Sequence, residues 1–154
     1  MLTATMHGPI VALDALAGGG THEGHNPSAT RARSSIQESI RCGASGKIDK
    51  ALEHGLEAYR DEEAPTELRL EAAKLCIDWH AALGDYGKCR VLAAGAVHLG
   101  TSYLERDHPL ILMLRNSEAY WLAILGDADM SARKFSALVA DVRNNPSLAP
   151  QLAF

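Results

Sequence analysis

The stretch Trp79-His80-Ala81-Ala82-Leu83-Gly84-Asp85 occurs a second time in this chain, as Trp121-Leu122-Ala123-Ile124-Leu125-Gly126-Asp127. Trp, Ala, Leu, Gly and Asp keep their order, and the two copies are 42 positions apart (121 − 79). Self-similarity at a fixed period of about 20–50 residues is typical of stacked-repeat proteins. The duplicated stretch therefore predicts a chain built from repeated units.

The composition favours a helical domain that does not bind nucleic acid. The chain has 154 residues, about the length of one domain, and 47% of them are hydrophobic. Ala and Leu carry most of that fraction, which favours helices over sheets. The 15 basic and 19 acidic residues give a net charge of −4. Since they form no basic stripe, we expect no nucleic-acid partner.

Cysteine usage and hydropathy favour a cytoplasmic protein. Cys42, Cys76 and Cys89 are odd in number and have no Cys-x-x-Cys spacing, which argues against a disulfide framework and fits a reducing compartment. The apolar run at 10–13 lacks a basic flank and is too short for a signal peptide. No stretch reaches the roughly 18–20 apolar residues of a membrane span, so we expect no membrane partner.

Apolar spacing predicts six helices, at about 30–43, 47–62, 66–83, 86–104, 109–125 and 129–144. The clearest stripe lies in the third helix, at steps of 4, 3, 4 and 4: Leu68, Ala72, Leu75, Trp79 and Leu83. The buried sets expected for the fourth and sixth helices are Tyr86, Val91, Leu92, Ala96, Leu99 and Tyr103, and Ala132, Phe135, Leu138, Val139 and Val142. The expected N-caps are Ser28 or Thr30 for the first helix, Thr66 in a partial capping box for the third, and Asp107 before Pro109 for the fifth.

The helices are expected to pair into three hairpins. Each pair is joined by a turn that carries a glycine, Gly46, Gly84 or Gly126, with spacings of 38 and 42 (84 − 46 and 126 − 84). The hairpins would occupy residues 29–146, after a flexible or loosely docked arm at 1–28 and before a short tail at 147–154. The first unit is the least regular, as is typical of a terminal repeat that faces solvent.

The three turns share one pattern, in which a small residue follows the glycine by five positions: Gly46-Lys47-Ile48 before Ala51, Gly84-Asp85-Tyr86 before Cys89, and Gly126-Asp127-Ala128 before Ser131. This pattern resembles the turn of the tetratricopeptide repeat, although Cys89 and Ser131 replace the usual Ala and Ser39 also departs from the family. The run from Asp107-His108-Pro109 through Arg115-Asn116-Ser117-Glu118-Ala119-Tyr120 to Gly126-Asp127 is similar to the longer variety, of roughly 42 residues, found in kinesin light chains and many bacterial regulators. The resemblance covers about 30–145.

The resemblance implies an all-α, right-handed solenoid of three hairpins with six main helices. The first helix of each hairpin would line a concave face that holds an extended peptide, with Asn and basic residues binding the peptide backbone or a terminal carboxylate. Positions matching the groove-facing residues of the family are Arg33, Ile36, Glu71, Lys74, Asp78, Met113, Asn116 and Tyr120. These types suit the role, because Asn offers both a donor and an acceptor to an amide and Lys offers a point charge to a carboxylate.

Three other patterns were weighed as sites of chemistry. His22-Glu23-Gly24-His25 lies in a Gly-rich stretch and is not the His-Glu-x-x-His zinc pattern, so we expect no metal and no cofactor. Cys76 and His80 share a helix face, but a nucleophile pair also needs an orienting group and an oxyanion site, and we expect no catalysis. Trp79 and Trp121 are expected in the core between helices, not in a ligand cage.

The sequence therefore predicts a non-catalytic adaptor or regulatory sensor that binds a protein or peptide segment in its groove. The alternative is a self-associating scaffold, or an accessory protein of a biosynthetic pathway, with Leu148, Leu152 and Phe154 or the 10–16 arm forming a homodimer contact. An enzyme built on the same repeats is the third interpretation.

Overall fold

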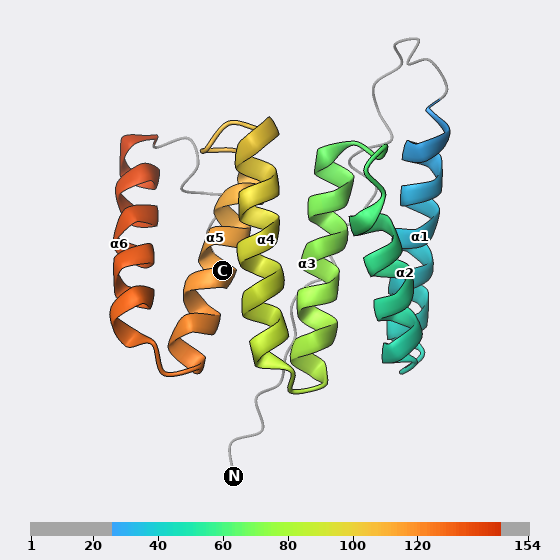
Figure 1. Cartoon of the computed structure of the whole chain (residues 1–154), viewed down its shortest axis with the longest axis horizontal. Helices are drawn as coiled ribbons and strands as arrows, with labels where there is room; N and C mark the ends of the chain where they lie inside the picture. The colour runs from blue at the N-terminus through green and yellow to red at the C-terminus, as the bar shows by residue number, and fades with distance from the viewer. Residues whose placement is uncertain (1–25, 146–154) are drawn as a thin grey trace.

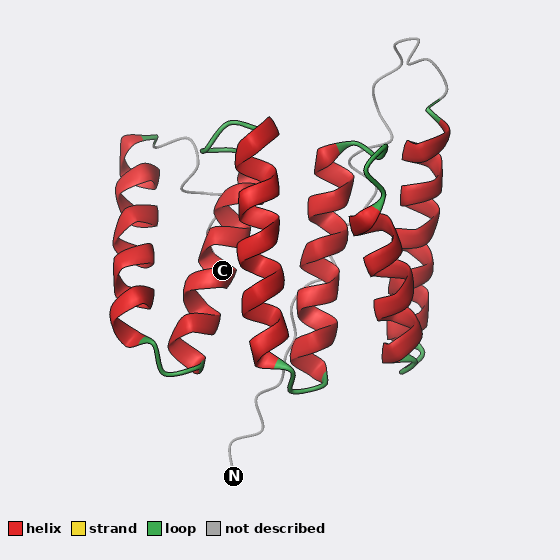
Figure 2. Ribbon diagram, in the orientation of Figure 1, coloured by secondary structure: helices red, strands yellow, loops and turns green. Residues whose placement is uncertain are grey.

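The computed structural model describes residues 26–145, which form six α-helices and no strand (Figure 2). The helices are α1 (Pro27–Ala44), α2 (Ile48–Arg60), α3 (Thr66–Ala82), α4 (Tyr86–Tyr103), α5 (Pro109–Ile124) and α6 (Ala128–Asn144). The predicted all-α class and the six helices are confirmed. Within 26–145, no helix combines the length and the apolarity that crossing a bilayer requires.

The first helix begins earlier than the spacing predicted. The side chain of Asn26 caps it by accepting hydrogen bonds from the backbone N–H groups of Ser28 and Ala29, and Pro27 occupies the first turn. Asn followed by Pro is a favourable start, because Asn satisfies free N–H groups and Pro has no N–H to leave unpaired. Neither Ser28 nor Thr30 is the cap, so that prediction is wrong.

Two further caps differ from the prediction. Thr66 is the first residue of α3 and not its cap, since Pro65 precedes it and makes no side-chain bond. At α5 the cap is His108, whose Nδ1 accepts a hydrogen bond from the backbone N–H of Leu110 at 3.3 Å. Asp107 lies one position too early for this role. In both cases the observed cap lies one residue from the expected one, and a proline restricts the backbone φ angle at the start of the helix.

The three glycines sit where the predicted turns require them. Gly46, Gly84 and Gly126 have φ values of +73°, +76° and +90°, and each follows the leading helix of a hairpin. A glycine adopts this left-handed conformation without the steric penalty that a Cβ brings. The turn pattern is therefore a genuine backbone repeat.

The helices stand side by side in chain order, each packed on the next (Figure 1). The leading helices also contact one another, α1 with α3 and α3 with α5. Within the described range, the second helices α2, α4 and α6 make no comparable backbone contact with one another. Neighbouring leading helices therefore lie closer to each other than neighbouring second helices do.

Two clusters form most of the core. The central cluster joins α3, α4 and α5: Leu70, Ala73, Ile77, Cys89, Ala93, Ala96, Ile111, Leu114 and Trp121. The first cluster joins α1, α2 and α3: Ala29, Ala32, Ile36, Ala58, Ala64, Leu68 and Ala72. Helix α3 contributes to both, so two of its faces are buried and not the single stripe that the spacing predicted.

Several apolar side chains expected in the core are exposed instead: Leu83, Tyr86, Val91, Tyr103, Ala132 and Val139. On α4 the small residues Ala93, Ala96 and Gly100 face the neighbouring helices, and Tyr86, Val91 and Tyr103 are exposed. At Gly100, an added Cβ would lie 3.0 Å from atoms of both Leu70 and Ile111. Within 26–145, α6 contacts a single helix, α5, whereas α4 contacts two.

One hydrogen bond recurs in every hairpin. A small hydroxyl or thiol donates to a backbone carbonyl twelve positions away: Ser39 Oγ to Ala51 O (2.7 Å), Cys89 Sγ to Ile77 O (3.4 Å) and Ser131 Oγ to Ala119 O (2.8 Å). These six residues are at most 4% exposed. In the first hairpin the donor is on the leading helix, and in the other two it is on the second helix. In each hairpin, one residue of this pair has no side-chain donor and the other residue supplies it. The unusual residues Cys89, Ser131 and Ser39 therefore satisfy buried polar groups.

The two tryptophans occupy corresponding places. The Trp79 ring packs against Gly43 of α1, and its Nε1–H donates to Ser39 Oγ at 3.1 Å. Ile77 and Ala81 precede Gly84 in α3 by the same numbers of residues as Ser39 and Gly43 precede Gly46 in α1. Trp121 lies in the central cluster with Ile77 and Ala81. Both rings thus pack on the preceding leading helix. Trp121 is in the core as expected, whereas Trp79 is half-buried and belongs to neither of these clusters.

Candidate peptide-binding groove

A pocket of about 220 Å³ opens between α3 and α5. Five of the eight residues predicted to face a groove line it: Lys74, Asp78, Met113, Asn116 and Tyr120. The remaining lining residues are Ile77, Leu114, Ser117 and Trp121. Pockets for drug-sized molecules span about 300–1,000 Å³, so this one suits a single side chain better than a cofactor.

The α3 wall of the pocket is an ion pair. Lys74 Nζ lies 3.7 Å from Asp78 Oδ2, one turn along the helix, and the two side chains are 45% and 58% exposed. Partial desolvation raises the pKa of Asp78, and the charge of Lys74 opposes that rise. Such exposed pairs contribute little to stability, so both charges are available to exchange partners with a ligand.

The α5 wall presents an amide with free hydrogen-bonding capacity. Asn116 is half-buried, and its side chain makes no hydrogen bond with another residue of 26–145. The neighbouring Ser117 hydroxyl, by contrast, accepts a hydrogen bond from Trp121 Nε1–H at 3.2 Å. The Asn116 amide can therefore pair with the N–H and C=O of an incoming peptide.

Aromatic rings fix one end of the pocket. Trp121 stacks on Tyr86 of α4 with ring centroids 5.4 Å apart, and Tyr120 meets the same ring edge-on at 4.9 Å. Tyr120 is 48% exposed, whereas Trp121 is 8% exposed. The buried ring holds the exposed one in place, so the pocket has a rigid apolar surface beside its polar wall.

The other three predicted residues lie on the α1 side. Arg33 is exposed and Glu71 is half-buried. Burial raises the pKa of Glu71, and the positive charge of Arg33 opposes that rise. Ile36 is 4% exposed and belongs to the first core cluster. Its predicted groove position is wrong, because α1 packs closely enough on α2 and α3 to enclose it.

Cys76 and His80 do not form a nucleophile pair. Cys76 is fully buried, and burial raises the pKa of its thiol to about 12. A nucleophilic cysteine needs a lowered pKa, so the environment works in the opposite direction. Cys76 packs on Gly55 of α2, where an added Cβ would lie 2.5 Å from the sulfur. Its role is tight contact between α2 and α3.

A polar cluster that the sequence did not indicate joins α5 to α6. Asp141 accepts from Arg115 at 2.7 Å and from Arg106 at 3.1 Å, and Asn145 donates to Asp107 at 2.8 Å. Partial burial would raise the pKa of Asp141, but the hydrogen bond and charge of Arg115 outweigh it and the pKa is lowered. Arg115 thus faces away from the groove and ties α6 to α5. The charge pattern alone contains no signal for this pairing across 26 positions (141 − 115).

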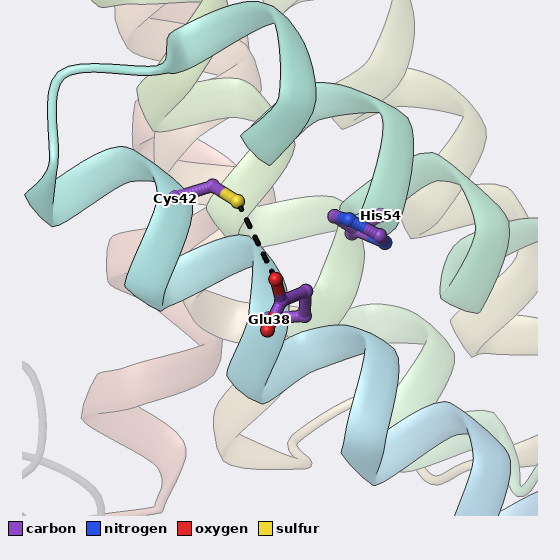
Figure 3. A group of neighbouring side chains, drawn as sticks. All are labelled: Glu38, Cys42 and His54. Atoms are coloured by element: carbon purple, nitrogen blue, oxygen red, sulfur yellow. Dashed lines mark hydrogen bonds between the residues drawn. The ribbon is translucent and has the colours of Figure 1, made fainter.

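The described residues also contain a group of metal-type ligands. Three converge away from the groove, Glu38 and Cys42 on α1 and His54 on α2 (Figure 3). His22 and His25, the pair considered from the sequence, lie outside the described residues, as do the apolar segments at 10–16 and 148–154.

No protein-family model matches this chain, and a search of the curated proteins finds no match.

Proposed function

We propose that residues 26–145 form a right-handed α-solenoid of three tetratricopeptide-like hairpins, whose leading helices line a concave groove. The spacing of the helices supports this proposal. Because α1, α3 and α5 contact one another and α2, α4 and α6 do not, the stack curves with its leading helices on the inner side. The shared turn glycines and the recurrent hydrogen bond support one repeated unit.

We propose further that the domain is a non-catalytic adaptor or regulatory protein that binds an extended peptide segment across α3 and α5. The observation that carries this proposal is the Asn116 amide, which has no partner within 26–145 and lies in the same pocket as the exposed Lys74–Asp78 pair. Asn116 would bind the peptide backbone, Lys74 would bind a carboxylate, and the apolar surface by Tyr120 would take one side chain.

A peptide array tests the proposal. Peptides that bind the full chain are expected to lose about tenfold in affinity with Asn116→Ala, because two peptide hydrogen bonds of about 0.5–1.5 kcal/mol each are removed. Lys74→Glu should cost most for peptides with a free terminal carboxylate. Arg90→Glu on α4 is the matched control, since it reverses the same charge on an exposed residue outside the pocket. Unchanged binding by both groove variants would reject the proposal.

The exposed apolar residues favour self-association as a second candidate. Leu83 and Tyr86 flank one turn, Ile124 and Leu125 flank the next, and Val139 lies on the terminal helix α6. Since soluble monomers rarely keep large apolar patches uncovered, these residues suit a contact between copies. Light scattering separates the two candidates, because a dimer that Leu125→Lys converts to a monomer with peptide binding intact assigns this surface to assembly.

A further inference from the structure

Three side chains with metal-binding chemistry converge on the first hairpin (Figure 3). Glu38 and Cys42 are four residues apart on α1 and share a face, and His54 reaches the same place from α2. One carboxylate oxygen, one sulfur and one ring nitrogen lie within 4.8 Å of one another. Cys42 Sγ and Glu38 Oε1 are 3.8 Å apart.

The burial of the three side chains suits an ion reached from one side. Cys42 is 5% exposed, while the Glu38 and His54 side chains are 35% and 32% exposed. The sulfur therefore forms a fixed inner end, and the two partly exposed side chains can rotate toward it. Ligand atoms around a tetrahedral Zn²⁺ are about 3.5 Å apart, given bonds of about 2.0–2.3 Å, so movements of about 1 Å suffice.

Each of the three side chains also has polar contacts within the protein. Both Glu38 carboxylate oxygens accept hydrogen bonds from the Arg41 guanidinium, and the Cys42 thiol donates to Glu38. His54 Nδ1 lies 3.8 Å from Glu57 Oε2, and Ser35 Oγ donates to that same oxygen at 3.2 Å. These contacts are compatible with metal binding, because one Glu38 oxygen can stay with Arg41 while the other turns to the ion.

We propose that Glu38, Cys42 and His54 bind one Zn²⁺ ion that joins α1 to α2. A thiolate, an imidazole and a carboxylate are the three ligand types that zinc accepts in proteins, and the thiolate selects against Mg²⁺ and Ca²⁺. Binding releases the Cys42 thiol proton to solvent, and the two anionic ligands balance the charge of the ion. The fourth position would hold water.

Glu57 is a positioning residue for this site. Metal-bound histidines usually donate their second ring N–H to a carboxylate or a carbonyl, which fixes the ring orientation and the tautomer. Glu57 stands beside Nδ1 of His54, so Nε2 is the atom left for the ion. The site is independent of the groove, because none of its residues lines the pocket between α3 and α5.

Zinc binding to the full chain tests the proposal. His22→Gln/His25→Gln is the starting protein, which removes the His-Glu-Gly-His pair of the sequence as a competing metal ligand. It should bind one equivalent of Zn²⁺ after dialysis against chelator, and Co²⁺ in its place should give the intense absorption of thiolate ligation. Cys42→Ser and His54→Gln should each weaken binding more than about 100-fold, and Glu57→Gln by about 10–100-fold.

His98→Gln is the matched control, since His98 is exposed on α4 and lies outside the cluster. Circular dichroism of the metal-free variants separates lost ligands from lost folding. Loss of the Co²⁺ thiolate absorption in Cys42→Ser, in which Cys76 and Cys89 are intact, identifies Cys42 as the thiolate ligand. No bound zinc in the starting protein, or binding unchanged by both Cys42→Ser and His54→Gln, would overturn the proposal. The expected pattern is loss with those two substitutions and retention with His98→Gln.

Discussion

At the interface of α1 with α3, the ring of Trp79 lies directly over Gly43. At the interface of α3 with α5, the corresponding Trp121 instead stacks on Tyr86 and lines a pocket. The residue at the position of Gly43 is Ala81 in the second unit. A Cβ at Gly43 would lie 2.3 Å from the Trp79 ring, and Ala81 carries that Cβ. A single methyl group therefore prevents Trp121 from lying as Trp79 does.

The comparison shows how one repeat position can have two uses. At the first interface an aromatic ring packs directly on the backbone of a glycine, whereas at the second the ring lines one end of a pocket. A substitution as small as Gly for Ala at corresponding positions therefore accompanies different surroundings of the two tryptophans.

The largest expected effect comes from removing the rings. Trp121→Ala should destabilise the fold by about 3–5 kcal/mol, because the ring is 8% exposed and the cavity left behind cannot fully collapse. Trp79→Ala should cost less, since that ring is only half-buried. Urea unfolding measures both values. A larger loss from Trp79 would show that the first interface, and not the second, dominates the core.

The next effect separates packing from helix propensity. Gly43→Ala should destabilise the fold by about 1–3 kcal/mol through overpacking against Trp79, despite the gain of about 1 kcal/mol that Ala brings to a helix. Gly87→Ala is the matched control, because a Cβ there meets nothing within 4 Å and should stabilise the protein. Thermal melts compare the two. Equal stabilisation by both would contradict the close contact at Gly43.

A smaller difference is expected for the recurrent hydrogen bond. Ser131→Ala removes one buried hydrogen bond and should cost about 0.5–1.5 kcal/mol. Ser39→Ala should cost about 1 kcal/mol more, because its Oγ both donates to Ala51 O and accepts from Trp79 Nε1–H, which would be left unpaired. Urea midpoints test the order. The reverse order would mean that water replaces Ser39 without cost.

The smallest effect is a dependence on pH. Burial lowers the pKa of His80, assisted by the charge of Lys88 and opposed by Asp85. The unfolded chain therefore binds the proton more readily, and stability should fall as pH drops below about 6.5, with a slope of at most about 1.4 kcal/mol per pH unit. His80→Leu, which copies Leu122 of the next unit, should remove that slope. An unchanged slope between pH 5 and 6.5 would exclude His80 as its source.

Sequence reasoning predicted the features that rest on backbone geometry. The turn glycines could be located because glycine is favoured where the backbone adopts a positive φ. The equivalence of Trp79 and Trp121 followed from the 42-residue period. Five groove residues were brought together for the same reason, since equivalent positions on neighbouring leading helices must lie side by side. These predictions depended on the register of the repeats and not on side-chain packing.

The predictions that were wrong depend on which face of each helix packs against its neighbours. The apolar residues of α4 occur on every side of the helix, so their pattern could not reveal that Ala93 and Ala96 face inward while Val91 faces outward. The cluster of Glu38, Cys42 and His54 combines two helices whose pairing register no local pattern fixes. Ile36 stands at a position equivalent to the other predicted groove residues, but α1 packs on α2 and α3 and encloses its side chain.

The two tryptophans allow the most direct test of the proposed groove. Each indole N–H gives its own signal in a ¹⁵N-edited NMR spectrum, assigned with Trp79→Phe and Trp121→Phe. Titration with a peptide selected on the array should shift the Trp121 signal to saturation and leave the Trp79 signal in place. A shift of Trp79 alone, or of neither signal at saturating peptide, would contradict binding between α3 and α5.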